Sequence, residues 1–287
     1  MITISETTIK TYRARIYRSQ PGSRIHNLTE AVEHVNRLGY LFFWPIQGVE
    51  FPSLWVAAAG DRPVPNEHDD PGHVTWGWKD QALSMRLWYY ARLLRRKNMM
   101  VSLQSAPYFY ALSPNYGDYE NDFLEDYRRG VLTAEARQVY EALLQKGPLD
   151  SIALREAAHL ANGTNAGRFA RALDDLQVTM RVMPVGVAPA GHFKYAFIYD
   201  IVPRYMPEIA EKARFIDEKT ARKHLLKQYF LALGAANRRS IEHFFRWKSD
   251  EYEQILLKLT EEGFLVDQCQ MENQKSPLLC LKPLLEN

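Results

Sequence analysis

The chain has 287 residues, which is long enough to build more than one hydrophobic core. Hydrophobic residues make up 46% of it and charged residues 24%, as in ordinary soluble globular proteins. Thirty-six Lys and Arg against 34 Asp and Glu leave a net charge of only +2, so the strongly basic balance of many nucleic-acid binders is excluded. Any affinity for DNA must therefore come from local clusters of basic residues.

The chain contains two cysteines, Cys269 and Cys280. Two cysteines cannot build a disulfide scaffold, and no Cys/His array has a metal-binding spacing, so we expect neither a metal nor another cofactor. We expect both thiols to pack in the core on the two strands of a C-terminal hairpin, where they can face each other. The surrounding residues give no support for a catalytic thiol.

The N-terminal residues have no basic start followed by an apolar run, so we expect no signal peptide. No run of about 18 apolar residues occurs, which argues against a membrane-spanning helix. Together these two features predict a cytoplasmic protein without a membrane partner.

Turn signals divide the chain into three sections and a linker. The first section ends at Arg128-Arg129-Gly130, the second ends at Val202-Pro203, and the linker contains Pro207. The expected divisions are residues 1–130, 131–203, 204–216 (the linker) and 217–287.

The first section has the least regular pattern. A helix is expected over residues 28–38, capped by Asn27 or Thr29 and ended by Gly39. A longer helix is expected from Asp80 to about Arg96, because apolar residues recur at helical spacing along it.

The second section has the clearest pattern. The expected elements are a helix capped by Thr133 and ended by Gly147-Pro148, a helix capped by Asp150, a third helix after the Asn162-Gly163-Thr164 turn, and strands over residues 178–187 and 193–201. Three helices followed by a hairpin form the element order of a winged helix.

The third section repeats this order. The expected elements are a helix over residues 218–233 ended by Gly234, a short helix with Ile241, Phe244 and Phe245, a helix capped by Ser249 and ended by Gly263, and strands over residues 264–269 and 278–282. The repetition predicts an α+β, helix-rich fold built from tandem winged helices, with the first section as a winged-helix-like domain that carries long insertions.

Two groups of residues are candidates for contacting DNA. No acidic residue lies between Asp80 and Asp118, and that window interleaves basic and aromatic residues, which suit phosphates and bases respectively. A second group lies at the start of the third helix of the second section, where recognition helices contact DNA. The candidates are Arg92, Arg95, Arg96 and Lys97 in the first group, and Thr164, Asn165, Arg168 and Arg171 in the second. The alternative interpretation of the first group is a solvated helix face with core aromatics. The alternative for the second group is a set of surface arginines near Asp174 and Asp175.

Residues 67–73 form a polar loop with two histidines and three carboxylates. Such residues can bind a metal or transfer protons. Their spacing matches no metal motif, and Pro71 and Gly72 indicate a surface turn in which these residue types are common.

Several segments, in order, resemble one family. They are Leu38-Gly39 with the hydrophobic run to Ile46, Pro52–Trp55, Arg95–Lys97 with Pro107–Tyr110, and the tandem units. As a set they resemble the winged-helix DNA glycosylases of the AlkZ/YcaQ type, and more closely the AlkZ-related branch. The resemblance implies a protein that clasps double-stranded DNA and hydrolyses the N-glycosidic bond of alkylated or cross-linked purines.

The family's site motif is Gln, an apolar residue, then Gln or Asp, shortly after Leu-Gly. Here those positions fall on Phe42 and Trp44. Neither aromatic can orient or deprotonate water as a carboxylate can, and both can equally be core residues. The candidates for a relocated catalytic group are Gln47, Glu50, Asp69 and Asp80.

Three functions fit this pattern. The first is a DNA-binding protein without glycosylase activity, such as a damage sensor or regulator. The second is an active DNA glycosylase with a relocated catalytic carboxylate. The third is another enzyme or a small-ligand binder on the same scaffold, with a cavity lined by Trp44, Trp76 and Trp78.

Overall fold

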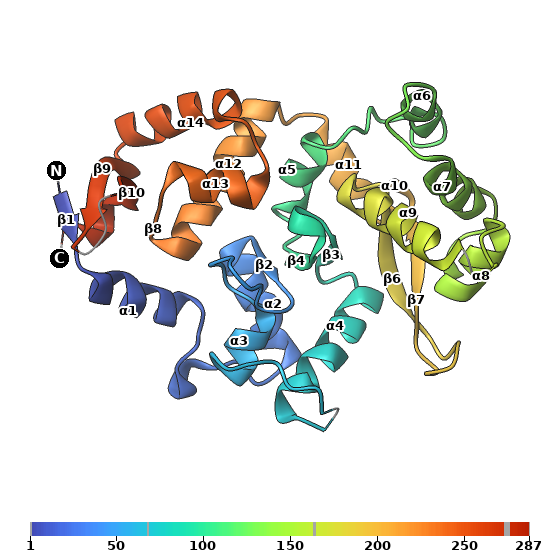
Figure 1. Ribbon diagram of the computed structural model, residues 1–287, viewed down its shortest axis with the longest axis horizontal. Coiled ribbons are helices and arrows are strands. Elements are labelled where there is room, and N and C mark those ends of the chain that lie inside the picture. The colour runs from blue at the N-terminus through green and yellow to red at the C-terminus, as the bar shows by residue number, and fades with distance from the viewer. Residues whose placement is uncertain (1, 68, 163–164, 273–275, 287) are drawn as a thin grey trace. The chain divides into compact units, whose positions relative to one another are not determined.

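The computed structural model describes residues 2–67, 69–162, 165–272 and 276–286 (Figure 1). The chain packs into two compact units: unit 1 comprises residues 1–75 and 219–287, and unit 2 comprises residues 76–218. The fold is α+β and rich in helix, as the sequence predicted. One unit boundary lies just after the expected linker and the other lies inside the expected first section. The division into domains at residues 130 and 203 stays a prediction.

The first part of unit 1 alternates short helices with two strands. Its elements are β1 (Ile2–Ile4), α1 (Glu6–Ile16), α2 (Leu28–Leu38), β2 (Tyr40–Phe42), α3 (Leu54–Ala59) and 3-10 turns at Pro21–Ser23 and Pro71–His73. The helix predicted over residues 28–38 is confirmed. Asn27 caps it by accepting a hydrogen bond from the backbone of Glu30 at 2.9 Å. Gly39 ends it with a φ of +82°, which glycine adopts at low cost.

The second part of unit 1 has the predicted order of three helices and a hairpin. Its elements are α12 (Glu218–Leu233), β8 (Ala235–Ala236), α13 (Arg238–Phe245), α14 (Ser249–Glu261), β9 (Leu265–Met271), β10 (Leu278–Leu281) and a 3-10 turn at Lys282–Leu284. One predicted cap was wrong. Ser249 is the first residue of α14, and Lys248 is the cap, because its backbone N–H donates to the Glu251 carboxylate at 2.6 Å.

A sheet with strand order β1-β9-β10-β8 closes unit 1 and holds β1 in parallel pairing with β9 (Figure 1). Cys269 on β9 and Cys280 on β10 are both fully buried, so the expected core packing of the thiols is confirmed. The register sets Cys269 opposite Leu278 and Cys280 opposite Val266, so the two thiols are near neighbours on adjacent strands but not a paired position. Burial raises the pKa of both thiols, as expected for inert core cysteines.

Aromatic rings form the centre of unit 1. Phe51 packs against Tyr40, Phe42 and Phe244 at ring-centroid distances of 5.3, 5.9 and 4.5 Å. The Tyr40 hydroxyl, buried with β2, donates to the backbone carbonyl of Leu225 on α12 at 2.8 Å. This contact joins two parts of unit 1 that lie far apart in the sequence.

The first part of unit 2 corrects one helix. Its elements are α4 (Val74–Ser84), β3 (Tyr89–Arg92), a 3-10 turn at Leu94–Arg96, β4 (Asn98–Val101), α5 (Ala106–Ala111) and α6 (Asp122–Arg128). The predicted helix from Asp80 to Arg96 is therefore wrong, because Asp80 lies inside α4 and residues 89–92 form a strand antiparallel to β4. Arg86 has a left-handed φ of +53°, and the buried aromatic run after it favours a strand.

The second part of unit 2 contains the other predicted three-helix order. Its elements are α7 (Ala134–Lys146), β5 (Leu149–Asp150), α8 (Ser151–Ala157), α9 (Ala166–Val178), β6 (Val182–Ala188), β7 (Ala196–Ile201), α10 (Val202–Tyr205) and α11 (Pro207–Ala213). Thr133 and Asp150 cap α7 and α8, as predicted. Both strands are shorter than expected, because α9 continues to Val178 and the hairpin turn extends to Tyr195. The expected linker is largely helical.

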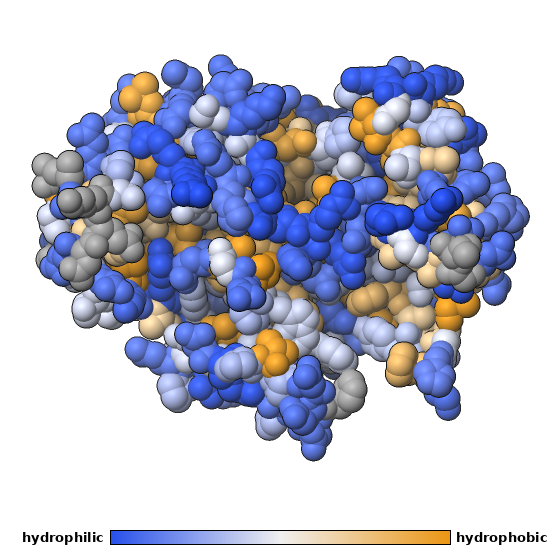
Figure 2. Space-filling view, in the orientation of Figure 1, coloured by the Kyte–Doolittle hydropathy of each residue, from blue (hydrophilic) through white to orange (hydrophobic). Residues whose placement is uncertain are grey.

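Helices α7, α8 and α9 pack their apolar faces against the sheet of order β5-β7-β6. Leu143 and Leu176 are fully buried there. The hairpin of β6 and β7 projects from the rest of unit 2, and its tip stands clear in the space-filling view (Figures 1 and 2). No helix within the described residues is long and apolar enough to cross a membrane.

Candidate functional site

The motif-equivalent residue Phe42 belongs to the core of unit 1. Its exposed fraction is 1%, and its ring meets Phe51 and Phe244 edge-on at 5.9 and 5.8 Å. Its backbone N–H donates to the carbonyl of Pro52 at 3.0 Å. Phe42 therefore packs in the aromatic core of unit 1.

Trp44, two residues further on, is half-buried in an aromatic cluster. Its ring lies 5.2 Å from Trp55 and 6.1 Å from His73, and the guanidinium of Arg62 lies 5.0 Å from the Trp55 ring. These contacts hold the Trp44 side chain in place within the aromatic cluster. In unit 2, Trp78 is buried and Trp76 is exposed. Neither of the two cavities described below is lined by any of the three tryptophans that were expected to line one.

The polar loop has a structural role at Asp70. This carboxylate accepts from Arg62 at 2.6 and 3.0 Å and from the backbone of Gly72 at 2.7 Å, and the Arg62 hydrogen bonds hold its pKa below the usual range. Asp69 is exposed, and His68 lies outside the described residues. Within the described ranges, no group of three His, Cys, Asp or Glu residues is close enough to hold a metal ion.

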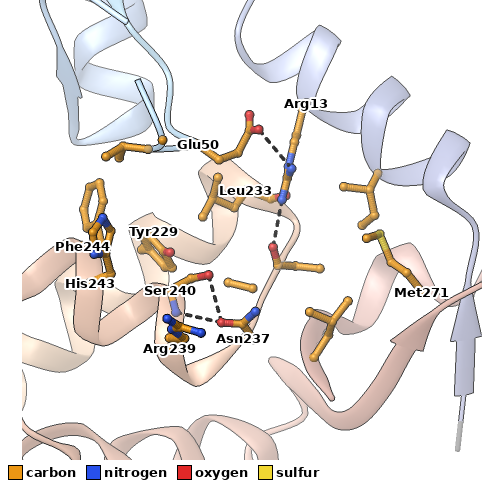
Figure 3. A pocket seen from close by; sticks show the side chains of 16 residues that line it. Arg13, Glu50, Tyr229, Leu233, Asn237, Arg239, Ser240, His243, Phe244 and Met271 are labelled. Carbon is orange, nitrogen blue, oxygen red and sulfur yellow. Dashed lines mark hydrogen bonds and ion pairs between the residues drawn. The ribbon is translucent and has the colours of Figure 1, made fainter. Parts of the chain in front are cut away.

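Glu50 lies on the wall of a cavity of about 500 Å³ in unit 1 (Figure 3). A tight turn from Ile46 to Val49 precedes it, closed by a 3.0 Å backbone hydrogen bond and by Gly48 at a φ of +74°. The turn directs Glu50 towards Arg13, whose guanidinium lies 3.6 Å from the carboxylate. The Glu50 side chain keeps 56% of its surface exposed, so the carboxylate is accessible.

Arg13 is held firmly beside Glu50 on the lining of the cavity. It donates to the carbonyls of Leu233 and Ala235 at 3.0 and 3.1 Å, beyond the C-terminal end of α12, where a cation is favoured. A second hollow, of about 820 Å³, adjoins the first, since both are lined by Arg13 and Glu50. Tyr17 lines this second hollow, and burial and then the nearby Glu50 charge raise its pKa well above the usual value.

The other candidate catalytic residues lie elsewhere. Gln47 is exposed and lines neither cavity. Asp80 belongs to a polar cluster of unit 2, in which it accepts from the Tyr195 hydroxyl at 2.9 Å and pairs with Lys79 at 3.0 Å. The Lys79 ammonium is buried and lies 4.5 Å from the Phe197 ring centroid. The polar groups of this cluster therefore satisfy one another inside unit 2.

The basic window of unit 2 is partly compensated by acidic residues of α9. Arg92 pairs with Asp174 at 2.6 Å and Arg96 pairs with Asp175 at 2.7 Å, both on α9. Arg95 and Arg96 lie in the turn between β3 and β4 with left-handed φ values, and Lys97 follows them at the surface. The window therefore docks onto α9 and retains only part of its positive charge.

The start of α9 presents the second group of candidates. Asn165 is the cap residue, and Arg168 and Arg171 are exposed on the first two turns. Arg168 makes a single, 3.4 Å contact with Glu135, and Thr164 lies outside the described residues. These arginines remain accessible to a partner.

Sequence reasoning missed two groups. The tip of the β6–β7 hairpin carries Phe193, 85% exposed, between His192 and Lys194. An aromatic between two basic residues in a turn was a readable signal. The cavity of unit 1 is lined by Asn237, Arg239 and His243 of α13 and its cap (Figure 3). Only the four-residue spacing of Arg239 and His243 hinted at a shared face.

The chain is rich in helix and twice contains three helices followed by a hairpin. A solved structure has a similar fold. The chain is similar to the DNA glycosylase AlkZ of Streptomyces sahachiroi, with a TM-score of 0.60 and 14% sequence identity, covering 99% of this chain and 72% of that one. At this identity the likeness concerns the fold alone. Among curated proteins, none matches the chain. The AlkZ-related family matches residues 25–246, and the chain belongs to that family.

Proposed function

We propose that the chain binds double-stranded DNA through the helices and hairpin of residues 131–203. In a winged helix, the third helix approaches a groove with its N-terminal residues and the hairpin contacts the backbone or the minor groove. Here the third helix is α9, which carries Arg168 and Arg171 exposed on its first turns. Membership of the AlkZ-related family supports the proposal.

The observation that carries the proposal is the tip of the β6–β7 hairpin. Phe193 is 85% exposed in the turn between β6 and β7, and the basic residues His192 and Lys194 flank it. An aromatic ring in this position can stack on a base or enter a base step, while His192 and Lys194 contact phosphates. A repair protein that searches for distorted base pairs needs such a probe.

The Arg168→Gln/Arg171→Gln double variant is expected to bind duplex DNA more weakly and to flatten the salt dependence. Each lost phosphate contact lowers the slope of log K against log salt by about 0.9, so the slope should fall by about 1 to 2. Fluorescence anisotropy with a labelled duplex at several salt concentrations measures both quantities. The matched control is Arg128→Gln/Arg129→Gln, which removes the same charge from the exposed end of α6.

Phe193→Ala separates stacking from charge in the same assay. Its affinity should fall by about 5- to 150-fold at every salt concentration with an unchanged slope, because a stacked ring contributes about 1–3 kcal/mol without releasing ions. Wild-type protein that fails to bind duplex DNA at low salt, or a double variant indistinguishable from its control, would contradict the proposal.

A second candidate function is N-glycosidic hydrolysis at Glu50, and one observation favours it. Of the four residues considered as a relocated catalytic group, Glu50 is the one whose carboxylate lines a cavity. A carboxylate beside a sugar can orient water and stabilise the positive charge that develops on C1′ as the base departs. In this scheme the water oxygen bonds to C1′ and gives a proton to the Glu50 carboxylate, while the C1′–N bond breaks and the alkylated base leaves with the bonding electrons.

Glu50→Gln is expected to slow base release from alkylated duplex DNA by about a hundredfold, because the amide keeps the shape but neither accepts a proton nor stabilises a cation. Abasic sites formed with time, revealed by alkaline cleavage of the strand, provide the measurement. Glu261→Gln is the control, since that carboxylate is exposed at the end of α14 and lines neither cavity. Equal rates for the two variants would rule out Glu50, and an inert wild-type protein would leave DNA binding as the function.

A further inference from the structure

The cavity of unit 1 is lined by apolar residues and also, on the side of α13 and its cap, by polar ones. Ile9, Val49, Leu233, Met271 and Leu278 supply aliphatic surface, and Tyr229 and Phe244 supply the edges of two otherwise buried rings. Asn237, Arg239, Ser240 and His243 line it from α13 and its cap, with Phe244 next to His243 and Tyr229 next to Ser240 (Figure 3). A volume of about 500 Å³ is in the range of small-molecule sites.

The polar side contains hydrogen-bond donors that the protein does not use. The Asn237 side-chain oxygen accepts from the backbone and hydroxyl of Ser240 at 2.7 and 2.9 Å, which orients the amide. In the described part of the chain, the Asn237 Nδ2 donates to no acceptor and no carboxylate pairs with Arg239. The oriented Asn237 amide and the exposed Arg239 side chain therefore lie together on the cavity lining.

The neighbouring Arg238, unlike Arg239, has carboxylate partners among the described residues. Arg238 donates to Glu253 at 2.9 and 3.1 Å and to Asp267 at 2.9 and 3.3 Å, so two carboxylates saturate its guanidinium. Arg238 fixes α13 to α14 and β9, and α13 then holds Arg239 towards the cavity. A rigid support of this kind favours a binding role for the second arginine.

The charge balance of the lining is positive. Arg13, Arg239 and His243 are the basic lining residues, and Glu50 is the one carboxylate among the lining residues described. Glu50 already pairs with Arg13, so the positive charge of Arg13 offsets the negative charge of Glu50. The unpaired donors and the net charge on the α13 side suit an anion that accepts several hydrogen bonds, and the planar geometry of guanidinium matches phosphate.

We propose that this cavity binds a phosphate-bearing nucleoside, with the phosphate on Arg239 and Asn237 and the base and sugar against the aliphatic and ring-edge side. The ligand chemistry is shared by a free nucleoside monophosphate and by a nucleotide at the end of a DNA strand. The site lies in unit 1 and uses none of the residues proposed to bind duplex DNA, so the inference goes beyond the proposed function.

The test is isothermal titration calorimetry on the full chain with purine nucleoside monophosphates, the matching nucleosides, and a short single strand carrying a 5′ phosphate. Monophosphates should bind at least tenfold more tightly than the nucleosides. Arg239→Gln should weaken monophosphate binding by about 10- to 150-fold, since a charge-assisted contact of about 1.5–3 kcal/mol is lost, and should leave nucleoside binding unchanged. Binding of the strand without binding of the free monophosphates assigns the ligand to DNA ends.

Lys258→Gln is the matched control, because it removes one exposed positive charge from α14, a residue that does not line the cavity. His243→Gln provides a second cavity variant and should also weaken monophosphate binding. The proposal is overturned if neither monophosphate nor strand binds, or if Arg239→Gln and Lys258→Gln behave alike. Arg239→Gln should bind duplex DNA with the wild-type salt slope, so the failure of this proposal and the failure of duplex binding are separately visible.

Discussion

Replacing Arg181 by methionine is expected to lower the free energy of unfolding of unit 2 by about 3–5 kcal/mol. Arg181 and Asp126 form an ion pair at 2.6 Å with side-chain exposures of 1% and 5%, and Arg181 also donates to the Pro114 carbonyl at 2.9 Å. Methionine occupies similar space but leaves the Asp126 carboxylate buried without its cation. Urea unfolding followed by far-ultraviolet circular dichroism measures the loss.

Two further variants show whether the uncompensated charge is the cause. Arg181→Met/Asp126→Leu removes both charges and should recover most of the stability that the single variant loses. Arg137→Met breaks the exposed pair with Glu141, one helical turn away on α7, and should cost less than about 1 kcal/mol. A loss in Arg181→Met no greater than in Arg137→Met would show that the buried pair is not important to unit 2.

Acidification from pH 7 to pH 4 is expected to destabilise the wild-type chain by about 3 kcal/mol more than the His34→Gln variant. His34 is buried on α2, and Arg37 donates to its Nδ1 at 3.0 Å, which requires the neutral ring. Burial, then the charges of Arg37 and Arg18, lower its pKa to about 3. In the unfolded chain the pKa returns to about 6.5.

The sign follows from proton binding. Below about pH 6.5 the unfolded chain takes up a proton that the folded chain refuses, so acid favours unfolding. The stability that depends on neutral His34 is complete above pH 6.5 and declines continuously as the pH falls towards 3. At pH 4 the difference of about 2.5 pH units corresponds to about 3 kcal/mol, at about 1.4 kcal/mol per unit.

Urea unfolding at pH 7, 5.5 and 4 measures this effect, and carboxylates that titrate in both proteins cancel in the difference. His26→Gln is the control, because His26 is exposed and lies just before the same helix. That control should follow the wild type at every pH. A wild-type chain and a His34→Gln variant that lose equal stability would refute the assignment.

Elements with local signals were predicted well. The helix over residues 28–38, the caps Thr133 and Asp150, and both orders of three helices and a hairpin are present. Caps and glycine stops act within one turn of the chain, so their effect is visible in the sequence. The helix expected from Asp80 to Arg96 failed because the run after Arg86 fits both periods, and strand pairing with β4 decided between them.

The candidate site was less accessible to prediction. Glu50 was one of four possible carboxylate or amide positions, and the turn at Gly48 selected it by bringing it to the cavity wall. Arg13 and Arg239 were not recognised, because they come from opposite ends of the sequence and meet the same cavity only in the fold. Arg92 and Arg96 were recognised as basic, but their partners on α9 lie about 80 residues away.

By itself, the sequence determined the order of helices and hairpin in residues 131–203 and 217–287, the resemblance to the AlkZ-related family and the aromatic character of positions 42 and 44, since each of these is a property of neighbouring residues. The tertiary structure alone decided which charges are neutralised and which face a cavity. Ion pairs and cavity walls join residues that are distant along the chain, so their energies depend on burial and approach distance, which a pattern of residue types does not contain.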